Sequence, residues 1–536
     1  MTLRKPGAAT ALCLLSVSAL TACGDGDRAR SGQAPPSQGL LAPAVRRLSV
    51  AELEQSASAV LGAPLDLQSA LPPDARQTDF SRNIGQSVDS LTLRELYDAT
   101  RSASEAAQLD NRVFPACAAH ARPADAACAS DTVSALAELA FRRAPSAAEL
   151  GRLLAVFDSG AEGGSFHDGV SLVLRALLAS PQLLYETTLG DAVASSGALP
   201  LTQSELASAL SYVISGTPPD SQLLAAAAAG RLASGAERQA QAVRLLGRPE
   251  TLQLFQRFVE EWLGLVQLPQ LAKSSAVATD FPALSRAMQQ ETRSFVADAL
   301  GSGGGDLATL FAGGYSFVPD QLAPVYGIEP VAAGTRVALR GVSRVGLLQQ
   351  SSFLSVFAHE GESAPVLRGK AVLVRLLCQP IPQPQELRIS VVLPAPDPHA
   401  TTRQRFERHV SDPLCATCHS RLDPVGFTFE NFDAIGRVRA TESDQPVDTH
   451  GSLTLDGTLV ELKDSVALSD AIAHSEELRS CVARQVVRFA SGRADAAAEA
   501  AFVTEVAGLP VAWRASLLGL FLSYVKSEGF AWRSAQ

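Results

Sequence analysis

The chain has 536 residues, enough for about three to five domains of ordinary size. Hydrophobic residues make up 46% of the sequence and charged residues 19%, a composition that excludes wholesale disorder. The net charge is -10, and no cluster of lysine and arginine is interleaved with aromatics, so nucleic acid is not expected as a partner. Aromatic residues make up only 6%, which favours helices packed on helices over a sheet sandwich.

The N-terminus has the features of an export signal. Arg4 and Lys5 precede an apolar stretch that is too short to span a membrane comfortably. Leu20-Thr-Ala-Cys23 resembles a bacterial lipobox, so we expect residues 1–22 to be a lipoprotein signal peptide and Cys23 to carry the lipid. The protein would then be exported and anchored at the cell envelope, on the periplasmic side or at the outer membrane. An ordinary secretory leader, with Cys23 incidental, is the alternative.

Helical signals dominate the chain after a tether at residues 23–44, which is rich in Gly, Pro, Ser and Gln. Four segments have the Ser/Thr-x-x-Glu spacing of a capping box followed by apolar residues at helical intervals, and they predict helices that begin near Ser49, Thr92, Ser146 and Thr202. Apolar residues also recur every three or four positions over residues 252–268 and 284–299. We therefore expect a mainly α protein, with bundle-like helical domains over residues 45–110, 129–190 and 199–330.

The last third of the chain is interrupted by a proline-rich stretch, Gln379 to His399, which is typical of an extended linker. Alternating residues around Asp456-Gly457 predict a β-hairpin, and helical patterning resumes at Ser465. We expect one domain over residues 340–440 and, after it, a β-hairpin with a C-terminal helical domain over residues 446–533.

The strongest chemical signal is Cys415-Ala-Thr-Cys418-His419. Two cysteines three residues apart on a helical turn can reach the two vinyl groups of one porphyrin, and the adjacent histidine can bind the iron as its proximal ligand. The motif predicts one covalent haem c in a cytochrome c-like segment within residues 340–440. A local redox disulfide, a zinc site and an empty motif are the alternatives. The redox disulfide lacks a surrounding βαβ pattern, and the zinc site lacks a second Cys/His pair at the spacing of a zinc finger.

The sequence defines the sixth iron ligand less well. His359 lies before the segment that leads to the motif and is the first candidate; otherwise it is a surface or capping residue. Met288 is the second, but it lies on the apolar face of a predicted helix, where filling a core is the usual role. An open position, which would permit ligand binding or oxygen chemistry, is the third possibility.

The residues after the motif also suggest a role beside a cofactor. Asp423-Pro-x-Gly-Phe427 is predicted to end the short helix that carries the motif, and Phe429, Phe432 and Ile435 to supply apolar surface. An ordinary turn with a small core explains the same residues equally well.

Export would place the remaining cysteines in an oxidising compartment, where disulfides are expected. Cys117 and Cys128 would close a short loop. By elimination, Cys378 would pair with Cys481 and tie the haem segment to the C-terminal helices.

The chain resembles the large exported cytochrome c-like proteins of planctomycete type, which are assembled from five consecutive domains of unknown function. The haem segment carries the similarity most clearly, in Leu367-Arg-Gly-Lys370, Leu377-Cys-Gln-Pro-Ile-Pro382, Asp412-Pro-x-Cys-x-x-Cys-His419 and Asp423-Pro-x-Gly-Phe427 to Asp433. Further similar blocks lie between residues 45 and 533. The resemblance implies haem binding and export but assigns no reaction, so only Cys415, Cys418 and His419 carry over as cofactor residues.

Three functions fit these observations. The first is electron transfer at the cell envelope, with the helical domains docking a redox protein partner. The second is a haem-dependent oxidoreductase acting on an unknown substrate, and the third is a surface binding protein with an accessory haem. Two strong protein ligands to the iron would favour the first, and a vacant position the second.

Overall fold

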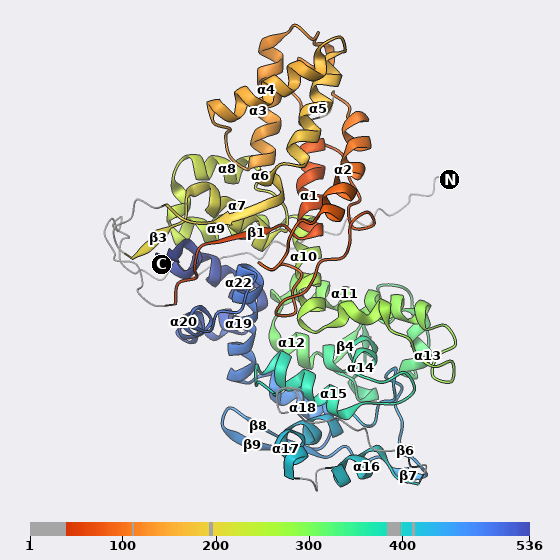
Figure 1. The fold of residues 1–536 in the computed structure, drawn as a ribbon. Helices are drawn as coiled ribbons and strands as arrows, with labels where there is room; N and C mark the ends of the chain where they lie inside the picture. Colours follow the sequence, from red (N-terminus) through yellow and green to blue (C-terminus); the bar gives the residue numbers. More distant parts are fainter. Residues whose placement is uncertain are drawn as a thin grey trace, which may run out of the picture.

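The computed structural model describes residues 39–109, 112–191, 197–382, 397, 399–409 and 413–535. The expected signal peptide, Cys23 and most of the tether lie outside these residues, as does most of the proline-rich linker. The described chain is mainly helical with a few short two-stranded sheets, so the predicted fold class is confirmed at this level (Figure 1).

The N-terminal third of the chain forms one helical unit, seen at the top of Figure 1. Residues from both expected domains, 45–110 and 129–190, pack into a single hydrophobic core that includes Leu53, Leu136 and Leu174. Its elements are β1 (Ala44–Arg47), α1 (Val50–Leu61), α2 (Ser90–Glu105), α3 (Ala126–Phe141), α4 (Ala147–Ala161), α5 (Phe166–Leu178), α6 (Pro181–Leu184) and β2 (Tyr185–Thr188). β1 and β2 pair antiparallel with Ala44 opposite Thr188, which closes the unit.

The rest of the described chain shares a second, larger core. Its first part contains β3 (Ala198–Pro200), α7 (Gln203–Ile214), α8 (Ser221–Ala228), α9 (Gly235–Leu245), α10 (Pro249–Trp262), α11 (Phe281–Gly303), α12 (Leu307–Ala312), β4 (Tyr315–Ser316), α13 (Ala323–Tyr326), β5 (Val337–Ala338), α14 (Ser351–Val356) and α15 (Pro365–Ala371). The expected helices at 252–268 and 284–299 correspond to α10, followed by a 3₁₀ turn at Leu265–Gln270, and to α11.

The second part of this unit begins with a π-helical turn, Val372–Leu376, directly after α15. It continues with α16 (Thr402–His409), α17 (Pro413–Phe427), β6 (Thr441–Glu442), β7 (Gln445–Pro446), β8 (Gly451–Leu455), β9 (Thr458–Leu462), α18 (Ser465–Ala473), α19 (Glu476–Ser491), α20 (Ala496–Ala507), α21 (Val511–Arg514), α22 (Leu517–Lys526), α23 (Glu528–Ala531) and β10 (Trp532–Ser534). β8 and β9 form the expected hairpin, whose turn residues Asp456 and Gly457 both have positive φ.

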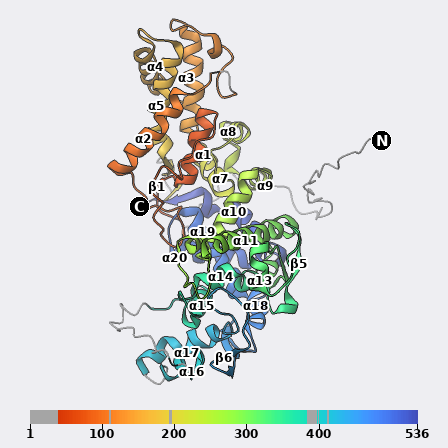
Figure 2. The ribbon, with the colours of Figure 1, turned by 90° about the vertical axis from the view of Figure 1, so that its right-hand side faces the viewer.

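The C-terminal helices return to the middle of the molecule. Both views show the blue C-terminal helices near the middle of the molecule (Figures 1 and 2). α22 packs on α9 and α19, and β10 pairs antiparallel with β3. A cluster of aromatic rings joins these distant segments. The centroid of the Phe258 ring in α10 lies 5.2 Å from the ring centroids of Phe489 in α19 and Phe521 in α22, and 5.4 Å from that of Phe80. The two ends of the described chain are therefore part of the same fold.

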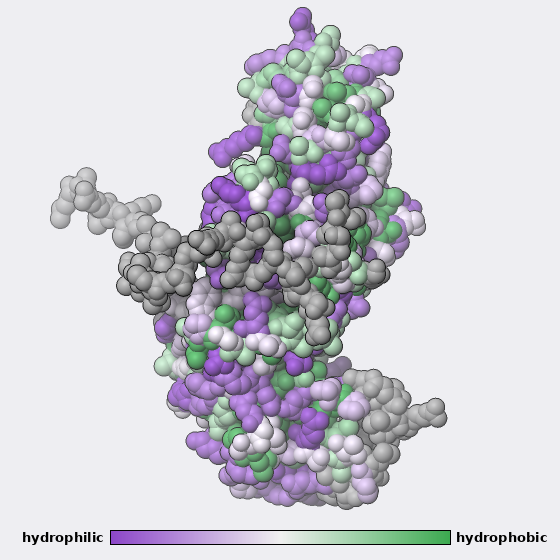
Figure 3. Space-filling model, turned by 90° about the vertical axis from the view of Figure 1, so that its left-hand side faces the viewer, coloured by the Kyte–Doolittle hydropathy of each residue, from purple (hydrophilic) through white to green (hydrophobic). Residues whose placement is uncertain are grey.

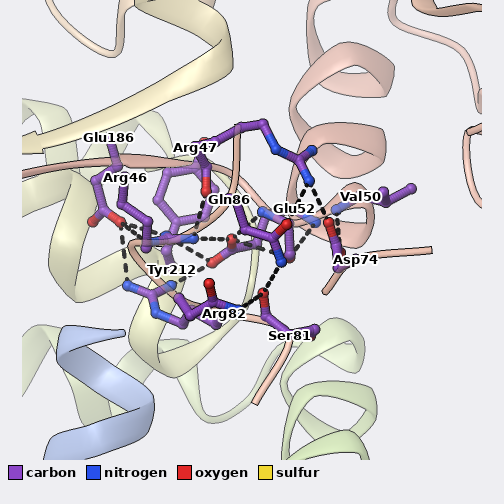
Figure 4. A network of polar contacts seen from close by, with 12 residues as sticks. Arg46, Arg47, Val50, Glu52, Asp74, Ser81, Arg82, Gln86, Glu186 and Tyr212 are labelled. Atoms are coloured by element: carbon purple, nitrogen blue, oxygen red, sulfur yellow. Dashed lines mark hydrogen bonds and ion pairs between the residues drawn. The ribbon is translucent and has the colours of Figure 1, made fainter. Parts of the chain in front are cut away.

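Four charged side chains, buried among β1, α1, β2 and the loop before α2, form a compact network (Figure 4). Arg46 donates to Glu52 at 2.6 Å and to Glu186 at 2.5 Å, and Arg82 binds the same two carboxylates. The two arginines hold the pKa of the fully buried Glu52 at about 2, although burial alone would raise it. Two positive and two negative charges thus compensate one another away from water.

The outer surface is mixed. On the face drawn in Figure 3, hydrophobic residues lie in small groups among hydrophilic ones, as is usual for a surface that contacts water. Within the described ranges, no helix has both the length and the apolar character needed to cross a bilayer.

Candidate haem-attachment site

The Cys-x-x-Cys-His motif lies in the first half of α17, which is longer than the sequence suggested. The helix does not end at Asp423-Pro424, as predicted, but continues to Phe427 with the proline inside it. Proline removes one backbone hydrogen bond and usually ends a helix. Here packing holds the last turn, because Gly426 lies against the backbone of Pro365 and the Pro424 carbonyl lies against Gly451 of β8.

The motif residues share one side of α17. Cys415, Cys418 and His419 occupy positions i, i+3 and i+4, which face the same way on an α-helix. All three are half-buried, and Cys418 packs against the main core. Within the part of the chain that the structure describes, Cys415 and Cys418 are not joined in a disulfide, and no group of three or more His, Cys, Asp and Glu side chains is arranged to hold a metal ion.

His419 is oriented by a carboxylate one helical turn further on. Its Nδ1 lies 2.9 Å and 3.1 Å from the two carboxylate oxygens of Asp423, whose side chain is only 2% exposed. A carboxylate can only accept, so in the neutral ring Nδ1 carries the proton and Nε2 carries the lone pair. A histidine that binds a metal usually donates its other ring N–H to such a partner. The donor set and its orientation therefore fit the two thioether bonds and one imidazole ligand of a c-type haem.

Asp423 is the site residue that the sequence analysis missed. The sequence suggested that it ended the helix, whereas the structure places it as the partner of His419. The signal was the spacing His-x-x-x-Asp, which brings the two side chains together only if the helix continues through Ser420, Arg421 and Leu422.

α15 holds α17 in place by close backbone contact. A Cβ atom added at Gly369 of α15 would overlap the carbonyl oxygen of Leu422, and one added at Gly426 would overlap that of Pro365. Only glycine permits this approach of the two helices. The block Leu367-Arg-Gly-Lys370 thus contributes to the site by packing against the motif helix.

Arg368 fixes the segment that follows α17. Its fully buried guanidinium donates to the carbonyl oxygens of Phe429, Phe432 and Asp433, with the last contact at 2.7 Å. Phe429 and Phe432 are themselves fully buried in the main core. The predicted apolar surface after the motif is therefore part of the protein core, held by a buried cation whose donors bind backbone oxygens.

The structure contains two disulfides, Cys117–Cys128 and Cys378–Cys481, which are the pairs considered from the sequence. The second lies beside the motif helix. Gln379, next to Cys378, accepts a hydrogen bond from Arg421 of α17 at 2.8 Å and donates one to Glu477 of α19. This disulfide therefore links α17 indirectly to the C-terminal helices.

The two candidates for the sixth ligand lie in different surroundings. Met288 is fully buried, and the Ser355 hydroxyl lies 3.6 Å from its sulfur. His359 is half-buried in the turn between α14 and α15, where its carbonyl accepts a hydrogen bond from Lys273 at 2.7 Å. Over the described ranges no hydrogen bond links either side chain to α17. Met288 has the environment of a core residue, and the identity of the sixth ligand stays a prediction.

The fold and the site define a mainly helical protein that carries a Cys-x-x-Cys-His motif on a helix packed into its main core. Three family models match parts of the chain, each described as a protein of unknown function: DUF1595 (PSD5) over residues 128–187, DUF1592 (PSD4) over 201–328 and DUF1588 (PSCyt3) over 344–442. The last match contains the whole motif region. These are domain families of the planctomycete-type cytochrome c-like proteins, so the resemblance is confirmed for three domains. No curated protein and no solved structure matches the chain significantly.

Proposed function

We propose that the protein is an exported, lipid-anchored c-type cytochrome-like protein that binds one haem and transfers electrons at the cell envelope. The observation that carries this proposal is the arrangement on α17: two cysteines and a histidine on one side of the helix, with the histidine oriented by a buried carboxylate. The bound iron would supply a one-electron couple.

The chain's own residues would each have a defined part. The thiols of Cys415 and Cys418 would hold the porphyrin through two thioether bonds, each S–H adding across one vinyl double bond. His419 would bind the iron through Nε2, because its Nδ1 faces the carboxylate of Asp423. The crossing of α15 and α17 and the bonds of Arg368 hold these side chains on a rigid element.

The remaining features support a location outside the cytoplasm. The N-terminal segment has the pattern of a lipoprotein signal, and the structure forms two disulfides, which persist in oxidising compartments. A small electron carrier needs about one domain, so the additional helical units give this chain surface on which to dock a redox protein partner.

The optical spectrum of the matured protein tests the proposal. The full chain is produced with its own leader in a host that attaches haem c, and spectra are recorded oxidised, reduced, and reduced with carbon monoxide. We expect one covalent haem per chain and little change with carbon monoxide, since a carrier has two protein ligands. A colourless protein, or one whose Cys415 and Cys418 thiols both titrate, contradicts haem attachment; a large carbon monoxide shift contradicts electron transfer and favours an oxidoreductase.

Variants assign the effect to the motif. Replacing both motif cysteines by alanine should abolish covalent haem, and His419→Ala should leave the haem attached with altered iron ligation. Ser420→Ala is the matched control, because Ser420 is exposed on the same helix. If the control loses haem as well, the loss reflects damage to α17 rather than removal of the attachment residues.

A further inference from the structure

Asp423 is a buried carboxylate whose side-chain partner is the histidine of the motif. Its side chain is 2% exposed, and over the described ranges its hydrogen bonds and ion pairs are those to Nδ1 of His419. Burying a carboxylate without a strong cation is costly, and proteins usually avoid it. Because the side-chain partner of Asp423 is the motif histidine, the carboxylate is placed to act on that imidazole.

Several other buried carboxylates of this chain bind arginine, whereas Glu291 accepts hydrogen bonds from the hydroxyls of Ser316 and Tyr326. Glu52 binds Arg46 at 2.6 Å, Glu430 binds Arg439 at 2.9 Å, and Glu499 binds Arg488 at 2.8 Å. Asp423 faces an imidazole instead, and a neutral imidazole does not cancel its charge. The negative charge is thus left beside the histidine of the motif.

We propose that Asp423 is a positioning residue that aims Nε2 of His419 at the iron and keeps the reduction potential of the haem low. This inference rests on the proposed haem attachment. An imidazole that donates its Nδ1–H to a carboxylate becomes a stronger electron donor at Nε2, which stabilises the ferric state relative to the ferrous state. The charge acts in the same direction, because it is buried and poorly screened by water.

A low potential also sets the direction of electron flow. The reduced site would give up its electron readily, so the redox partner docked on the helical units would be an acceptor of higher potential. Hydrogen bonds around a haem ligand are a recognised means by which a protein adjusts its potential. Here the adjusting group belongs to the motif helix itself, one turn after the ligand.

The test compares Asp423→Asn with a matched substitution at another aspartate–histidine pair. Asp448 accepts from Nδ1 of His450 at 2.8 Å, but both residues are exposed and neither belongs to the motif helix, so Asp448→Asn is the control. Haem content is measured first, by mass and by the absorbance of the denatured haem. The midpoint potential is then measured by optical redox titration of the full chain.

We expect Asp423→Asn to carry one haem and to shift the ferrous-to-ferric ratio at the wild-type midpoint by about tenfold or more toward ferrous. Tenfold corresponds to ~59 mV for a one-electron couple. The control should keep the wild-type midpoint. An unchanged midpoint in Asp423→Asn, with haem attached, overturns the inference and leaves the proposed function intact, whereas a wild-type protein without haem overturns both.

A second variant guards against a folding defect. If Asp423→Asn does not accumulate, Asp423→Ser removes the charge with a side chain too short to reach Nδ1, and the same upward shift is expected. The midpoint potential is a readout that stability alone does not move. It should rise in either variant, and an unchanged midpoint in a variant that carries haem contradicts the role given to Asp423.

Discussion

The crossing of α15 and α17 can be tested by adding one methyl group. In Gly369→Ala the new Cβ would overlap the Leu422 carbonyl oxygen and lie 3.1 Å from the backbone nitrogen of Gly426. Backbone atoms cannot turn aside as a flexible side chain can, so the helices must separate. A separation of roughly 1 Å forfeits about half of the dispersion energy across the contact. Overpacking of this kind costs about 1–3 kcal/mol, and a backbone clash places this substitution near the upper end.

Gly301→Ala is the matched control for this change. Gly301 lies in α11 of the same unit, and nothing lies within 4 Å of a Cβ added there. Replacing glycine by alanine at such a helical position stabilises by about 0.5–1 kcal/mol, so the two variants should change stability in opposite directions.

Urea unfolding of the matured protein is the assay for both glycine variants, followed through tryptophan fluorescence, to which the buried Trp262 contributes. Haem content is recorded in parallel, because a displaced α17 should also attach haem less completely. The reasoning is refuted if Gly369→Ala is at least as stable as the wild type, since the close approach described here would then not exist.

Three further predictions concern buried groups, each measured as the free energy of unfolding. The pKa of Glu52 is lowered from 4.5 to about 2, so Glu52→Gln should cost about 3 kcal/mol at pH 7, and the wild type should lose this stability as the pH falls from 4.5 toward 2. Burial raises the pKa of Glu291 from 4.5 to about 7, so the free energy of unfolding of the wild type should fall by up to about 3 kcal/mol as the pH rises from 4.5 to about 7. The Glu291→Gln variant should not show this loss. Equal pH profiles of the two proteins would contradict the prediction. Replacing Cys378 and Cys481 by serine, which removes a disulfide spanning 103 residues, should cost about 2–5 kcal/mol, and wild-type thermal stability in the variant would show that this link adds nothing.

Local signals predicted the helices well where no other residue competed for the cap. The capping boxes at Ser49, Ser146 and Thr202 are all formed. A helix does begin near Thr92, at Ser90, but the capping box at Thr92 is not formed: Asp89 accepts a hydrogen bond from the backbone N–H of Thr92 and caps the helix instead. A single sequence offers both capping patterns.

The limits of α17 could not be predicted from its residues alone. Proline at position 424 is a strong local signal for a helix end, and it was outweighed by contacts with Pro365 and Gly451, which lie far away in the sequence. The partner of His419 was missed because Asp423 was given the role of a helix end, whereas its side chain reaches back one turn to the imidazole. Helix continuation at a proline depends on tertiary packing, which a local pattern does not contain.

The blocks that resemble other haem-segment sequences divide into two physical groups. Cys415 and His419 would touch the cofactor. Gly369 instead packs against the backbone of Leu422, and Arg368 donates to carbonyl oxygens of the segment after α17. The supporting group can therefore form whether or not haem is bound. A variant without the motif cysteines should accordingly keep the α15–α17 crossing, and the stability change of Gly369→Ala should be similar in that background. If instead the substitution cost nothing there, the crossing would depend on the cofactor, and the helices would assemble around the haem rather than present a prepared site to it.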